Sequence, residues 1–61
     1  MKVRDVLRLL EDHGWRLART RGSHRQFKHP GHRNVITLAG KPGDDLAAGT
    51  LNSILRKAGL K

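Results

Sequence analysis

The chain has 61 residues, and its 13 lysines and arginines outnumber the five acidic residues to give a formal net charge of +8. So short a chain holds a single small core, and we expect one domain over residues 1–61. Because cysteine is absent, disulfides and thiolate metal sites are excluded. No apolar run approaches the roughly 20 residues of a membrane span, and no signal-peptide pattern opens the sequence, so we expect a cytoplasmic protein that does not bind membranes. The positive charge favours a polyanion, with nucleic acid as the first candidate.

The first element is an amphipathic helix over residues 3–13. Its apolar side chains recur every three or four positions, and charged side chains fill the other face. Gly14 suits a left-handed cap at the end of this helix. We therefore expect the chain to turn there and to enter a strand at Trp15.

Three segments with strand patterns follow, over residues 15–19, 23–28 and 34–38. Turn-forming residues separate them, at residues 21–22 and at residues 29–32. The short connections predict an antiparallel arrangement of consecutive strands.

Large apolar side chains recur at alternate strand positions. Trp15 and Leu17 share a face of the first strand, and Ile36 and Leu38 point inward from the third. Phe27 is the one large apolar residue of the second strand, so we expect it to point to the same core.

If Phe27 points inward, alternation sends its neighbours on the second strand to the opposite face. These neighbours are His24, Gln26 and Lys28. The histidine is therefore expected to be exposed on the face of the sheet that the core does not use.

The remaining chain predicts a loop over residues 40–45 and a last helix, with Thr50 as its N-cap and Gly59 at its end. One face of this helix is apolar and carries Leu51, Ile54, Leu55 and Ala58. The order helix, three strands, helix predicts an α+β fold. In this fold both helices pack on one face of a three-stranded antiparallel sheet and the other face is free.

The segment Gly-Ser-His-Arg-Gln-Phe-Lys-His-Pro, residues 22–30, resembles the signature of HicA-type toxins, the RNA-cutting half of a toxin–antitoxin pair. Residues 9–15 and 49–60 are similar to the first and last helical regions of that family, so the resemblance covers nearly the whole chain. It implies a fold like that of double-stranded-RNA-binding domains, which agrees with the element order derived above. It also implies a partner, an antitoxin of the HicB type.

The resemblance places the catalytic histidine of the family at His24. Histidine changes protonation near neutral pH, so it can accept a proton and later return it. We expect cleavage of mRNA without metal or other cofactor, in which the 2′-hydroxyl of the RNA attacks the adjacent phosphate. The alternative is that His24 is an exposed strand histidine without a role.

Basic and small residues around His24 are candidates for RNA contacts. We expect such contacts from Arg19, Arg21, Gly22, Ser23, Arg25, Lys28 and Lys41. Arg25 shares strand parity with Phe27, so it reaches RNA only by curling around the edge of the sheet. The only aromatic residues, Trp15 and Phe27, are expected in the core, which predicts recognition of backbone and shape rather than base stacking.

Three other functions compete with this interpretation. A metal site made by His24, His29 and His32 lacks acidic or cysteine ligands nearby, so we expect none. A non-catalytic RNA-binding module would use the same basic surface. A DNA-binding regulator would need a recognition helix rich in arginine or amide side chains, whereas the last helix offers only Asn52, Arg56 and Lys57.

Overall fold

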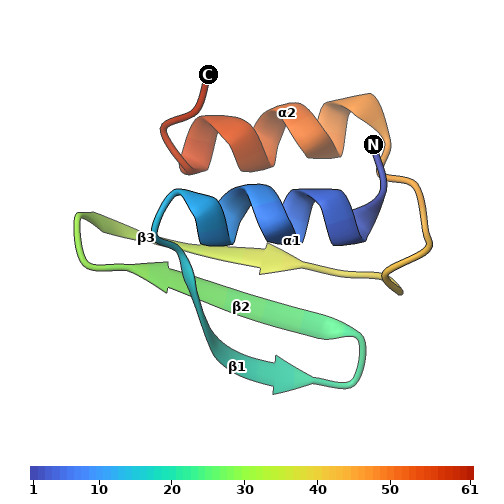
Figure 1. Ribbon diagram of the computed structural model, residues 1–61, viewed down its shortest axis with the longest axis horizontal. Helices are drawn as coiled ribbons and strands as arrows, with labels where there is room; N and C mark the ends of the chain where they lie inside the picture. The colour runs from blue at the N-terminus through green and yellow to red at the C-terminus, as the bar shows by residue number, and fades with distance from the viewer.

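The computed structural model describes all 61 residues and contains five elements. These are α1 (Val3–Asp12), β1 (Arg16–Arg21), β2 (His24–His29), β3 (His32–Leu38) and α2 (Ala48–Lys57) (Figure 1). The strands form one antiparallel sheet in the order β1-β2-β3. The predicted α+β order is confirmed, and neither helix is long and apolar enough to cross a bilayer.

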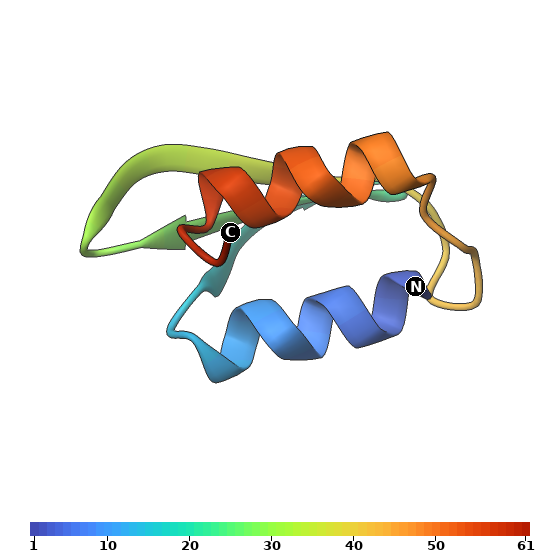
Figure 2. The same ribbon diagram turned by 90° about the horizontal axis from the view of Figure 1, so that it is seen from above.

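Both helices bury side chains in one core on a single side of the sheet. Figure 2 shows α1 on this side of the sheet and α2 beside β3, with the two helices running in the same direction. The core consists of Val3, Val6, Leu10, Trp15, Phe27, Ile36, Leu38, Ile54 and Ala58. No polar or charged residue is buried. The opposite face of the sheet is therefore left open, as predicted.

The helices end in the same way, with a glycine that lets the chain reverse. Gly14 has φ +90°, and its N–H donates to the carbonyl of Glu11 at 3.1 Å while the N–H of Trp15 donates to that of Leu10 at 3.0 Å. This pair of bonds is the Schellman motif, which satisfies carbonyls that the helix itself leaves free. The same pattern closes α2 around Gly59.

The start of α2 differs from the prediction. The helix begins at Ala48 after an N-cap residue, Ala47, that makes no side-chain capping bond, so Thr50 lies within the first turn. The half-buried Leu46 fixes this start, because its N–H donates to the carbonyl of Met1 at 2.9 Å. Alanine has the highest helix propensity, so the helix can begin directly after that anchor.

The first strand also differs from the prediction, because it begins at Arg16 and extends to Arg21. Trp15 is fully buried before the strand begins, whereas the side chain of Leu17 is 54% exposed. Leu17 pairs with Phe27 and so lies on the core side of the sheet, but β1 is an edge strand beyond the cover of the helices (Figure 1). The predicted face of Leu17 is thus confirmed, and the position of β1 at the sheet edge explains why the side chain is exposed there.

Two histidines pack around Trp15. The ring of His32 stacks on the indole at a centroid distance of 5.0 Å, and the ring of His29 lies 5.3 Å away. The N–H of Gly31 donates to Nδ1 of His29 at 2.8 Å, so the ring proton is on Nε2, which donates to the carbonyl of His13 at 3.0 Å. His29 therefore ties the β2–β3 hairpin to the end of α1.

Replacing Gly14 should destabilise this junction. A Cβ at Gly14 would lie 2.8 Å from Nε2 of His29, and the φ of +90° is unfavourable for any side chain. Strained backbone of this kind costs about 1–3 kcal/mol, to which the close contact adds. We expect Gly14→Ala to lower the free energy of unfolding, measured by urea denaturation.

The matched control is Gly22→Ala. Gly22 has φ +60°, but an added Cβ meets nothing within 4 Å. This variant isolates the backbone cost, so we expect a smaller loss of stability than for Gly14→Ala. Equal losses would show that the contact with His29 contributes nothing.

Candidate nucleic-acid interface

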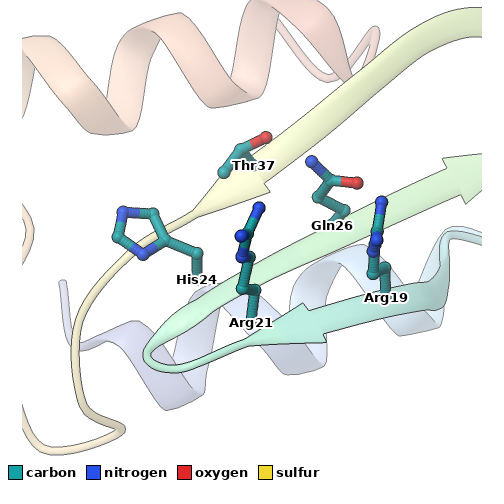
Figure 3. A pocket seen from close by; sticks show the side chains of 5 residues that line it. All are labelled: Arg19, Arg21, His24, Gln26 and Thr37. Atoms are coloured by element: carbon teal, nitrogen blue, oxygen red, sulfur yellow. The ribbon is translucent and has the colours of Figure 1, made fainter.

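A shallow hollow lies on the open face of the sheet. It is lined by Arg19, Arg21, His24, Gln26 and Thr37, with no apolar residue among them (Figure 3). All three strands contribute to it. The structure thus brings together three of the predicted site residues with two that were not assigned a role in the site.

A bulge in β1 brings two of the arginines to this face. Leu17 pairs with Phe27 and Arg19 pairs with Gln26, so β1 has one extra residue, Ala18, between these pairs. Strand side chains alternate between faces, so without the extra residue Arg19 and Arg21 would share the core side with Leu17. The bulge reverses the alternation and directs both guanidinium groups to the face of His24.

The β1–β2 turn places His24 directly opposite Arg21. These two residues pair across the strands, and Gly22 and Ser23 form the two-residue connection between them. Gly22 has φ +60° and no residue other than glycine has positive φ, which is the pattern of a type II′ turn. Gly22 and Ser23 therefore shape the turn and do not line the hollow.

The cationic side chains of the hollow are free of partners within the chain. Neither Arg19 nor Arg21 donates a hydrogen bond or forms an ion pair, and the ring of His24 makes no hydrogen bond. The single ion pair of the protein joins Lys2 and Asp45. No acidic residue lines the hollow, so its positive potential is uncompensated and favours an anion.

Three of the predicted contact residues lie elsewhere. Arg25 is half-buried on the core side, where its guanidinium donates to the carbonyl of Gly40 at 3.2 Å. Lys28 is exposed further along β2, and Lys41 is exposed in the loop after β3. None of the three lines the hollow, and Arg25 has a structural bond in place of the expected path around the sheet edge.

Gln26 and Thr37 are the site residues that the sequence reasoning did not assign. They pair with each other across β2 and β3, and their side chains lie close to Arg19 and His24 (Figure 3). Alternation along each strand places both side chains on the open face, because Gln26 is next to the inward-pointing Phe27 and Thr37 lies between the buried Ile36 and Leu38. The strand pairing that joins them is a long-range contact that alternation along one strand does not specify.

No group of three or more histidine and acidic side chains lies close enough together to hold a metal ion. His29 and His32 instead pack against Trp15, on the other side of the sheet from His24. The ionisable groups available for chemistry in the hollow are therefore His24 and the two arginines.

Comparison with known proteins gives the family. A family model, HicA toxin of bacterial toxin-antitoxin, matches residues 3–60. The chain belongs to the HicA toxin family. The solved structure of a HicA3 and HicB3 toxin-antitoxin complex is similar to this HicA-family chain, with a TM-score of 0.83 and 34% sequence identity over 100% of this chain and 97% of that chain. A search of curated proteins found no match.

Family membership confirms the resemblance carried by residues 22–30 and makes this protein a toxin of the toxin–antitoxin class. The similar structure also agrees with the fold of helix, three strands and helix. The candidate site of this HicA-family protein is the hollow that contains His24, Arg19 and Arg21.

The different placements of two arginines predict different effects of replacement. Arg25→Ala removes a half-buried hydrogen bond to Gly40 and should lower the free energy of unfolding by about 0.5–1.5 kcal/mol. Arg21→Ala removes a side chain without intrachain partners, and such surface changes usually stay within about 0.5 kcal/mol. Thermal and urea unfolding of both variants checks this, and a larger loss for Arg21→Ala would contradict the assignment.

Proposed function

We propose that this protein is a metal-independent endoribonuclease that cleaves mRNA with His24. The observation that carries the proposal is the position of an unpartnered histidine beside two unpartnered arginines in an open hollow. Membership of a toxin family supports the interpretation that this activity is the toxic one. The mRNA substrate also implies that the protein acts in the cytoplasm.

In the proposed reaction the RNA supplies its own nucleophile. The 2′-oxygen attacks the adjacent phosphorus while His24 accepts the 2′-hydroxyl proton, and the bond from phosphorus to the 5′-oxygen breaks. The proton held by His24 then passes to the leaving 5′-oxygen. The products are a 2′,3′-cyclic phosphate and a 5′-hydroxyl end.

Arg19 and Arg21 are suited to stabilise the charge that builds on the phosphoryl oxygens. Arg21 pairs across the strands with His24, and Arg19 is two positions away on the same face. Guanidinium groups present several donors in a planar fork that matches phosphate. Because they already point into the hollow, they need little rearrangement to meet the transition state.

We propose that RNA is recognised through its backbone. Trp15 and Phe27, the only Trp, Tyr or Phe residues, are buried in the core, so no large aromatic side chain is exposed for bases to stack on. Cations binding phosphate fix position without reading sequence. Weak sequence preference follows.

A HicB-type antitoxin is the proposed protein partner. The similar structure is that of a HicA3 and HicB3 complex, and the net charge of +8 suits a partner with an acidic surface. An acidic surface bound to the two arginines would cover His24 and exclude RNA from the hollow. Neutralisation and catalysis would then depend on one face of the sheet.

Replacing His24 should separate cleavage from binding. We expect His24→Ala to lose cleavage by about 10²–10⁴-fold or more, the contribution of a positioned proton-transfer group, while binding of uncleaved RNA persists. The measurement compares cleavage of labelled RNA and binding to a non-cleavable analogue for both proteins. His13→Ala is the control, because His13 is an exposed histidine outside the hollow. Cleavage by His24→Ala equal to that of the wild type would exclude His24 as the catalytic residue, and RNA binding without cleavage by either protein would leave a non-catalytic RNA-binding module.

The nucleophile can be tested on the substrate. RNA with 2′-O-methyl groups throughout should resist cleavage, because the attacking oxygen is blocked, and excess EDTA should leave the cleavage of ordinary RNA unchanged. Gel analysis of both substrates with and without EDTA checks the two expectations. Cleavage of the methylated RNA would exclude attack by the 2′-oxygen, and loss of activity in EDTA would indicate a metal-dependent reaction.

A further inference from the structure

A second groove lies between β3 and α2. It is lined by Ile36, Thr37, Gly49, Thr50, Ser53, Ile54 and Lys57. Thr37 also lines the hollow that contains His24, so the two depressions share this residue. The proposed reaction at His24 does not involve this groove.

One side of the groove is a polar stripe along α2. Gly49, Ser53 and Lys57 are spaced four residues apart, so they lie on one face of the helix and span roughly 12 Å of its length. A Cβ added at Gly49 would meet nothing within 4 Å, so this end of the stripe is open. The hydroxyls of Thr50 and Ser53 and the ammonium of Lys57 thus line the helix side of the groove.

The polar side chains on the helix side of the groove, those of Thr50, Ser53 and Lys57, are unpartnered within the chain. Neither Ser53 nor Thr50 makes a side-chain hydrogen bond, and Lys57 forms neither a hydrogen bond nor an ion pair. The two isoleucines of the groove are buried in the core, so they offer little apolar surface to a ligand. Hydrogen-bond donors with no acidic residue beside them are suited to bind a phosphate backbone.

We propose that the groove between β3 and α2 binds the continuation of the RNA strand whose scissile phosphate lies at His24. The strand crosses Thr37 and places a flanking phosphate against Ser53 and Lys57. This inference rests on the proposed function, and it adds the path of the substrate. The groove shares Thr37 with the hollow, so a strand that leaves His24 across this residue reaches the groove, and this favours RNA over a segment of a partner protein.

The last turn of α2 provides a matched pair of variants. Arg56 and Lys57 are adjacent and exposed, but only Lys57 lines the groove. Neutralising either one removes the same charge from nearly the same place. A difference between Lys57→Gln and Arg56→Gln therefore reports a contact and not the general potential.

The experiment measures binding of a single-stranded uridine oligonucleotide to both variants in the His24→Ala background, over a range of salt concentrations. We expect Lys57→Gln to weaken binding several-fold and to reduce the slope of log affinity against log salt by about 0.7, the value for one phosphate contact on a single strand. Arg56→Gln should change the slope little. Thermal melting of both variants verifies that they are folded.

Equal salt slopes for the two variants would overturn the proposal. If Lys57→Gln then weakened the binding of an antitoxin alone, the groove would be a site for the partner protein and not for RNA.

A second test varies the length of the RNA. Backbone amide shifts of Ser53 and Thr50 in the His24→Ala protein should respond to the oligonucleotide but not to a uridine dinucleotide, and no response to either would also reject the groove. Cleavage by the protein with native His24 is measured separately, so failure of the groove and failure of the ribonuclease proposal are distinguishable.

Discussion

The indole of Trp15 occupies the point where the ends of both helices meet the β2–β3 hairpin. It is fully buried and packs against the rings of His29 and His32. A Cβ at Gly14 would lie 2.8 Å from His29, and one at Gly59 would lie 3.2 Å from His32, so the glycines that end the two helices approach the same pair of rings. Trp15 is one of the nine buried residues of the core, so its indole connects that core to the ends of both helices and to the hairpin.

Trp15 makes this contribution despite one cost. Its Nε1 is buried without a hydrogen-bond partner, which is unfavourable by about 1–3 kcal/mol. Burial of about 150–250 Å² of indole, at about 25 cal/mol per Å², stabilises the fold by about 4–6 kcal/mol. Packing outweighs the unsatisfied N–H, which explains how so small a protein places its largest side chain at this junction.

Because the core takes one face of the sheet, the other is available for chemistry, and the bulge at Ala18 determines which cations reach it. A regular β1 would direct Arg19 and Arg21 toward the core side. The proposed activity therefore depends on a backbone irregularity as much as on His24. The two faces of the sheet also separate neighbouring residues of β2. Arg25 is bonded to Gly40 on the core side, whereas His24 lies in the hollow on the open side.

The sequence predicted the features that local rules determine. The element order, the cap at Gly14 and the exposure of His24 follow from periodicity and parity along single segments. The bulge at Ala18, the bond from Arg25 to Gly40 and the start of α2 depend on contacts with distant segments. Arg19 and Arg21 were predicted at the site because they are near His24 in the sequence. They reach it because the strand register shifts at Ala18, which the sequence alone does not show.

The exposed edge of β1 has a consequence for solubility. β1 pairs only with β2, so its outer backbone groups can template pairing with another chain, a hazard of any long edge strand. Positive side chains and a bulge are two devices that natural sheets use against such self-association, and β1 has both, in Arg16, Arg19, Arg21 and the irregularity at Ala18. The arginines proposed to hold RNA thus also keep copies of the protein apart. A variant inactivated by replacing these arginines also loses the charge that opposes self-association, whereas a change at His24 leaves the charged edge intact.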